Sequence, residues 1–354
     1  MASRLRICER SGFSAFWGNF STRRPVSMRS QAKAVVSSVR PEGYSNWPES
    51  GRELTHRILQ IGNETLSLSF SPDFGGSILR FKARTGAGWV SILRDSPEQL
   101  RSSSDCASFL MAPYPNRVRD GRFTFEGRDY QLANPEKHAI HGCVRNRPWE
   151  VASFTDSSAV LSFSSESFDD IDFPFPFEAK LTYKIEGCRM TWEVAIENCG
   201  AVNMPAGFGF HPYFRNSLSD SEMVSLKFHA AGYYPTAAKI PIPTGAALPL
   251  TSELDFSRGR KPADGLDHCL SGWDGLATLT WSASKVQLTM AAGPGMEHLV
   301  IYKPPGSSDT ALEPQSMAND GLNLSNRGIA GSGVQVLRPG ERCRGQVEFT
   351  LQEI

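Results

Sequence analysis

Short segments in which apolar and polar residues alternate occur along most of the chain. They include "TLSLSFS" from Thr65, "AVLSFSSES" from Ala159 and "VQLTMAAG" from Val286. A period of two is typical of β-strands that bury one face and expose the other. A helical period is almost absent, and the only segment that favours a helix is the short "SPEQLRSS", residues 96–103. The pattern therefore predicts an all-β protein.

Two longer segments predict hairpins. In "GRFTFEGRDYQL" the turn is expected at Glu126-Gly127, and in "EAKLTYKIEGCRMTWEVAIENCG" at Glu186-Gly187. Hairpins at short spacing indicate an antiparallel sandwich or barrel. The sequence shows no repeat of fixed period, and its composition does not change after residue 50. We therefore expect one large, many-stranded sandwich domain over residues 49–354.

The charge is balanced overall but not along the chain. Lysine plus arginine and aspartate plus glutamate each number 37, yet residues 1–45 carry eight basic and two acidic side chains. The balance predicts no nucleic-acid partner, and no apolar run reaches the roughly 18 residues of a membrane span. Residues 1–48 are rich in Ser and Arg, which is typical of a transit peptide. We expect import into a plastid, with a mitochondrion or a cytoplasmic protein bearing a disordered tail as alternatives, and a monomer.

Five polar spots interrupt the apolar and turn pattern. They hold Asn116 and Arg117, His138 and His141, His211, Asp267 and His268, and Glu313. Each has a structural interpretation: a surface charge for Arg117, a hydrogen-bonded loop histidine for His211, a strand end for Glu313. His138 and His268 are expected to be solvated. The His138/His141 pair has no cysteine or carboxylate at ligand spacing, so we expect no metal site.

The order of these motifs resembles the aldose 1-epimerase (galactose mutarotase) family. The resemblance runs from about Leu54 to the C-terminus, and its motifs are "PNRVRDGRFTFEGRDYQL", "HAIHG", "HPYF", "EPQ" and "VLRPGE". It implies a large antiparallel β-supersandwich with a sugar site in a cleft on one sheet. It also implies a small-molecule sugar substrate, interconversion of hexose anomers such as those of glucose and galactose, and no cofactor.

The resemblance also implies roles for six residues. Glu313 matches the general base and His211 the general acid. His141 matches a second, sugar-binding histidine, Asn116 and Arg117 match sugar contacts, and Asp267 matches a carboxylate that accepts hydrogen bonds from ring hydroxyls. For ring opening, His211 has to be protonated while Glu313 is ionised, and we expect the nearby carboxylate to favour the imidazolium.

The chain departs from the family pattern at two places. Cys143 follows His141-Gly142 where many members have a second glycine, and "MEHLVIYKPP" lacks a glutamine that many members place before a tyrosine. His298 or Glu297 is a candidate replacement.

Two other functions stay open from the sequence. One is a hexose-6-phosphate 1-epimerase on the same fold, for which Arg145 and Arg147 would supply phosphate contacts. The other is a non-catalytic carbohydrate-binding or structural subunit of a plastid complex, which would have no need to keep Glu313 and His211 together.

Overall fold

The computed structural model describes residues 56–220, 222–237 and 240–354. The basic head, residues 1–48, lies outside the described residues, so plastid import stays a prediction.

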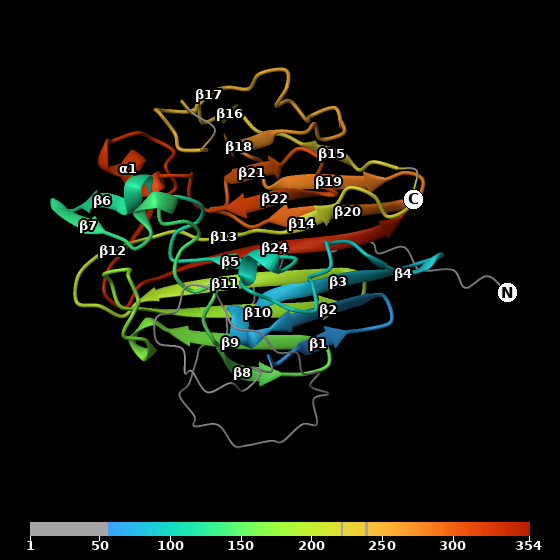
Figure 1. Cartoon of the computed structure of the whole chain (residues 1–354), viewed down its shortest axis with the longest axis horizontal. Helices are drawn as coiled ribbons and strands as arrows, with labels where there is room; N and C mark the ends of the chain where they lie inside the picture. The colour runs from blue at the N-terminus through green and yellow to red at the C-terminus, as the bar shows by residue number, and fades with distance from the viewer. Residues whose placement is uncertain (1–55, 221, 238–239) are drawn as a thin grey trace.

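Most strands belong to two eight-stranded antiparallel sheets (Figure 1). The first sheet has the strand order β15 (Ser225–Phe228), β19 (Leu276–Trp281), β20 (Val286–Ala292), β24 (Arg342–Glu353), β11 (Arg189–Asn198), β10 (Phe177–Glu186), β9 (Ser158–Ser164), β8 (Glu150–Phe154). The second has the order β17 (Leu248–Pro249), β16 (Gly232–Tyr233), β18 (Leu266–Ser271), β21 (His298–Lys303), β22 (Asp309–Gln315), β13 (Gly209–Phe210), β5 (Leu110–Met111), with β14 (Tyr213–Arg215) also paired to β22.

Smaller elements complete the fold. A four-stranded sheet consists of β1 (Leu59–Gly62), β2 (Leu66–Ser71), β3 (Ser77–Thr85) and β4 (Gly88–Ser91). Two ribbons are β6 (Arg122–Phe125) with β7 (Arg128–Gln131), and β12 (Met204–Ala206) with β23 (Gln335–Leu337). The described helices are α1 (Gly321–Asn326) and the 3-10 turns η1 (Pro72–Phe74), η2 (Ser103–Asp105), η3 (Arg119–Gly121), η4 (Pro135–Lys137) and η5 (Ser165–Ser167).

The core lies where the three larger sheets meet. Phe349 of β24 contacts Trp192 of β11 at 4.3 Å between ring centroids, Phe81 of β3 at 6.3 Å and Phe214 of β14 at 6.1 Å. In Figure 1 the four-stranded sheet lies over β9 and β10, and Phe70 of β2 packs on Tyr183 of β10. One hydrophobic cluster thus joins the sheets.

The all-β supersandwich and both hairpins are confirmed. The β6–β7 turn is Glu126-Gly127, both with positive φ, as a two-residue hairpin requires. In the β10–β11 hairpin Glu186 pairs with Arg189, so the two-residue loop begins at Gly187, one residue later than predicted.

The helix expected over residues 96–103 is wrong. That segment is irregular until η2, and the side chain of Ser102 caps η2 instead. Pro97 and Leu100 are the only apolar residues of this segment. A helix there would therefore have no apolar face to bury.

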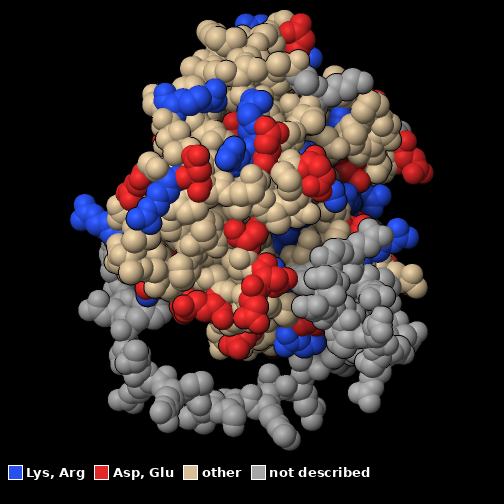
Figure 2. Space-filling model, turned by 60° about the vertical axis from the view of Figure 1, so that its left-hand side comes forward, with Lys and Arg blue, Asp and Glu red and all other residues tan. Residues whose placement is uncertain are grey.

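Surface charge is mixed on the face shown in Figure 2. Acidic and basic side chains lie interspersed there, with a group of acidic ones near the lower edge of the coloured surface. That face carries no continuous basic stripe of the kind that tracks a nucleic-acid backbone. Within the described residues, no helix has the length and apolar character needed to cross a membrane.

Packing of β24 against Phe208 requires a residue without a side chain at position 345. A Cβ at Gly345 would lie 2.1 Å from the ring of Phe208, which is fully buried. We expect Gly345→Ala to lower the free energy of unfolding by about 1–3 kcal/mol, because the core must be overpacked. Urea denaturation measures this change. Gly293→Ala is the control, since its Cβ would have no neighbour closer than 3.6 Å; equal stability of the two variants would contradict the packing argument.

Candidate active site

The centre of the site is a buried contact between a carboxyl group and an imidazole. Side chains alternate along β22, so Leu312 enters the core while Glu313 points to the opposite face. There Glu313 Oε1 lies 3.1 Å from His211 Nε2. Glu313 is 1% exposed and His211 4% exposed. The sequence-distant acid and base candidates are therefore direct neighbours.

Strand register places further groups on the same face. Ala311 pairs with Tyr302 of β21, which pairs with Asp267 of β18. Because residues two apart share a face, Asp267 and Tyr302 lie on the side of the sheet that carries Glu313. Both are half-buried. Gln315 donates from Nε2 to Glu313 Oε2 at 3.2 Å and holds the carboxyl group.

Two loops bring the remaining polar residues to this face. The backbone N–H of His141 donates to the carbonyl of Asn116 at 2.6 Å, and both residues have positive φ. The His141 ring stands at 84° to the His211 ring, with centroids 5.2 Å apart. Gly142 makes this approach possible, since a Cβ there would lie 2.0 Å from the carbonyl oxygen of Ala112.

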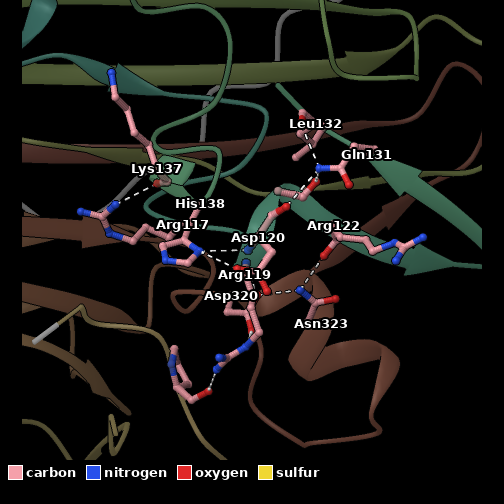
Figure 3. A network of polar contacts seen from close by, with 12 residues as sticks. Arg117, Arg119, Asp120, Arg122, Gln131, Leu132, Lys137, His138, Asp320 and Asn323 are labelled. Carbon is pink, nitrogen blue, oxygen red and sulfur yellow. Dashed lines mark hydrogen bonds and ion pairs between the residues drawn. The ribbon is translucent and has the colours of Figure 1, made fainter. Parts of the chain in front are cut away.

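Arg117 is fixed by a polar network behind it (Figure 3). Its Nη1 donates to the carbonyl of Lys137 at 2.9 Å, and its own carbonyl accepts from the N–H of Asp320 at 2.7 Å. The Asp320 carboxyl group, which is fully buried, accepts from the N–H of Arg119 at 2.8 Å and from Asn323 Nδ2 at 2.7 Å. Asp320 thus clamps the backbone at two points, the carbonyl of Arg117 and the N–H of Arg119.

Burial pushes the central pair toward its uncharged form. It raises the pKa of Glu313 well above its usual value, and the charge of Asp267 raises it further. Burial, and then the positive charges of Arg94 and Arg145, lower the pKa of His211 to about 3. We expected the carboxylate to favour an imidazolium, but desolvation by burial outweighs that attraction. The pair therefore favours a protonated Glu313 carboxyl group that faces a neutral imidazole across the 3.1 Å contact.

The half-buried residues around the pair respond in the same way. Burial raises the pKa of Asp267 to about 6, while Arg117 acts to lower it. Burial lowers the pKa of Arg117, and the charges of Asp267 and Glu313 oppose that shift. These reciprocal effects show that Arg117 lies within electrostatic reach of both carboxyl groups.

Several buried polar atoms at this face lack any hydrogen-bond partner among the described residues. They are Asn116 Oδ1, Arg117 Nε, His141 Nδ1, His211 Nδ1 and Gln315 Oε1. Buried polar groups are normally satisfied, and an unsatisfied one costs roughly 1–3 kcal/mol. Five of the twelve such atoms among the described residues lie around this acid–base pair, where the hydroxyl groups of a ligand could pair with them.

All six residues singled out as site candidates come together on this face. Of the other polar candidates, His298 also lies on it, because it pairs with Gln315 in the ladder. His138 Nδ1 accepts from the N–H of Asp120 at 2.9 Å. His268 lies on the opposite face of β18 from Asp267 and packs near Tyr233. His298 is tied by Nε2 to the carbonyl of Gly331 at 2.9 Å, so it holds a loop.

Of the two arginines that suggested a phosphate site, one is already engaged. Arg147 pairs with Asp170 at 2.6 Å and donates to the carbonyl of Cys143. Within the described part of the chain no carboxylate lies at ion-pair distance from Arg145, whose Nη1 donates to the hydroxyl group of Ser104 at 2.9 Å. In the same part of the chain no three His, Cys, Asp or Glu side chains are grouped as metal ligands.

Sequence reasoning did not assign roles to four residues that surround the pair. These are Arg94, Phe109, Tyr213 and Tyr302. Tyr213 belongs to the "HPYF" motif and Tyr302 to the "MEHLVIYKPP" segment, so proximity to a candidate was a usable signal for both. Arg94 and Phe109 carry no local signal, because only the fold brings them to His211.

The raised pKa of Glu313 makes a prediction for stability against pH. An unfolded glutamate titrates near ~4.3. Above that pH the unfolded chain has released a proton that folded Glu313 still holds, so stability falls as pH rises toward the folded pKa. Glu313→Gln removes this loss. We expect the variant to gain stability over the wild type progressively above about pH 4.3, with one pKa unit worth about 1.4 kcal/mol.

Thermal unfolding of both proteins between pH 4 and pH 8 measures the difference. The exposed Glu136→Gln is the matched control and should follow the wild type throughout. Parallel curves for wild type and Glu313→Gln would refute a raised pKa at Glu313.

Comparison with known proteins identifies the family. A family model for aldose 1-epimerase matches residues 57–350. The uncharacterized protein YphB of Escherichia coli (strain K12) is 24% identical over 306 residues, covering 83% of this chain and 99% of YphB. A galactose mutarotase-like protein from Clostridium acetobutylicum has a TM-score of 0.71 at 18% identity, covering 84% of this chain and 96% of its own. The GalM/aldose epimerase homologue from C. elegans has a TM-score of 0.69 at 17% identity, covering 84% and 99%. Since the family model spans most of the sequence, the chain belongs to the aldose 1-epimerase family.

Proposed function

We propose that this protein is an aldose 1-epimerase that interconverts the α and β anomers of a free hexose such as glucose or galactose. The observation that carries the proposal is the buried 3.1 Å contact between Glu313 and His211, surrounded by polar atoms without partners. The reaction needs one group that takes a proton and one that gives a proton, and a carboxylate and an imidazolium suffice.

The proton on Glu313 sets the starting state of the reaction. When a sugar binds, its hydroxyl groups replace the solvation that the pair lacks, and the proton of Glu313 moves to His211 across their contact. The Glu313 carboxylate then removes the proton of the C1 hydroxyl while His211 gives its proton to the ring oxygen, and the bond between C1 and the ring oxygen breaks. Rotation about C1–C2 and the reverse steps yield the other anomer. No proton is gained or lost overall.

The neighbouring residues bind and orient the sugar. Arg117 supplies hydrogen-bond donors and Asp267 acceptors, and a hydroxyl group can satisfy both. Asn116 Oδ1 and His141 Nδ1 have no partner among the described residues, and the His141 ring lies 5.2 Å from the His211 ring. Their fixed backbones favour a preorganised site, which lowers the entropy cost of binding.

Glu313→Gln should lower the rate of mutarotation by about 10²–10⁴-fold, and His211→Asn by a similar factor, because each removes one proton carrier. Polarimetry of freshly dissolved α-D-glucose and α-D-galactose with the full chain measures this, with α-anomer-enriched glucose 6-phosphate followed by NMR as a third substrate. Glu136→Gln is the exposed control. Acceleration that survives in both site variants would remove the proposed roles. Acceleration of the phosphorylated sugar alone would favour the hexose-6-phosphate function, and none at all, a non-catalytic one.

The clamp on Arg117 gives a second prediction. Asp320→Ala leaves the N–H of Arg119 without its acceptor, so the segment that carries Arg117 loosens. We expect the KM for the sugar to rise about tenfold, with a smaller change in kcat, since the binding residue is displaced and the acid–base pair is not. Steady-state mutarotation kinetics test this. Asp129→Ala, an exposed carboxylate on the nearby ribbon, is the control; an unchanged KM in folded Asp320→Ala would reject the clamp.

A further inference from the structure

The His211 ring is flanked by two aromatic rings. Its centroid lies 4.6 Å from that of Phe109 at 33°, and 4.5 Å from that of Tyr213 at 31°. The backbone fixes this arrangement, because the N–H of His211 donates to the carbonyl of Phe109 and the N–H of Tyr213 to that of Ala107, both at 3.0 Å. The Tyr213 hydroxyl also lies 3.5 Å from His211 Nε2, the atom that faces Glu313.

An arginine guanidinium group lies over each of the two flanking rings. Arg94 Cζ lies 3.5 Å from the centroid of the Tyr213 ring, and Arg145 Cζ lies 5.0 Å from that of Phe109. Both distances are within the range of a cation–π interaction. The order of contacts is therefore Arg145, Phe109, His211, Tyr213, Arg94, which we term the histidine stack.

One short segment anchors both ends of the histidine stack. Arg94 donates from Nε and Nη2 to the carbonyl of Cys106, at 3.0 and 2.7 Å, and from Nη2 to that of Ser104. Arg145 donates from Nη1 to the hydroxyl groups of Ser104 at 2.9 Å and Ser103 at 3.3 Å. The segment is held by the capping box of η2, in which Ser102 and Asp105 bond reciprocally. The two guanidinium groups thus share a rigid base.

The charge of the stack acts on its central residue. Within the described residues no carboxylate lies at ion-pair distance from Arg94 or Arg145. The other titratable groups that face His211 are Glu313 from β22, His141 and the Tyr213 hydroxyl. After burial, the two arginines are the main cause of the lowered pKa of His211.

We propose that Arg94 and Arg145 are positioning residues of this site, which act through Tyr213 and Phe109 to hold the His211 ring against Glu313 and which place two positive charges beside it. The inference deepens the proposed function and rests on it for its meaning in catalysis. It assigns a role to two arginines that lie outside the matched acid–base and sugar-binding set.

The test measures the protonation of His211 directly. The chain has seven histidines, and comparison with His211→Asn assigns the His211 ring signal in NMR spectra recorded against pH. In Arg94→Gln and in Arg145→Gln we expect the midpoint to rise by about one pH unit, the effect of removing a nearby unit charge. We also expect kcat to fall about tenfold while KM changes less, because ring orientation is lost.

Two matched variants separate charge and folding from position. Arg145→Lys keeps the charge, so its midpoint should stay near that of the wild type, while its kcat falls because the planar stack is lost. Arg101→Gln removes an exposed arginine beside the same segment and should change neither quantity. Unshifted midpoints in both folded Arg→Gln variants would overturn the inference. Absence of mutarotation by the wild type would overturn the proposed function alone, since the titration reads His211 without turnover.

Discussion

The contact between Glu313 and His211 constrains the whole site, because two ionisable groups are buried there with almost no solvent. In such surroundings each group favours its uncharged form, so the proton of the pair lies on the Glu313 carboxyl group. The residues around the pair influence which of the two groups holds that proton. Gln315 holds the carboxyl group, the charge of Asp267 disfavours its ionisation, and the histidine stack disfavours a charged imidazole. A ligand that supplies hydrogen bonds to the charged forms would reverse this balance.

The site is built from two kinds of backbone with different tasks. Strands β18, β21 and β22 carry Asp267 and Glu313, and their register fixes which side chains share a face. The loops carry Asn116, His141 and Asp320 at positive φ, a conformation that costs such residues of order 1 kcal/mol or more and persists only where surroundings enforce it. Here hydrogen bonds between the loops enforce it. Two of these positions, Asn116 and His141, are candidate sugar contacts, and the third, Asp320, holds the segment that carries Arg117.

Much of the fold was predictable from the local pattern, because a strand with one buried face has apolar residues at every second position. The hairpins at β6–β7 and β10–β11 show this, and the second missed its turn by one residue since Glu186 still pairs in the ladder. The site residues were predictable only as a family set. The sequence around Arg94 or Phe109 does not indicate that either residue lies near His211. Arg94 is 117 positions and Phe109 is 102 positions away from His211 along the chain, and the fold brings them together. The failed helix at residues 96–103 has the converse cause, a polar segment without a face to bury.

The energetic cost of these buried polar groups bears on whether the protein has a purely structural role. A protein with a purely structural role gains nothing from five buried polar atoms without partners, each of which costs roughly 1–3 kcal/mol. Nor does it gain from a buried carboxyl group, whose ionisation opposes folding as pH rises. Apolar side chains of similar size in place of Glu313 and His211 would remove both costs. Since marginal stability leaves only about 5–15 kcal/mol in total, a ligand whose hydroxyl groups pair with these atoms would offset a substantial part of that cost.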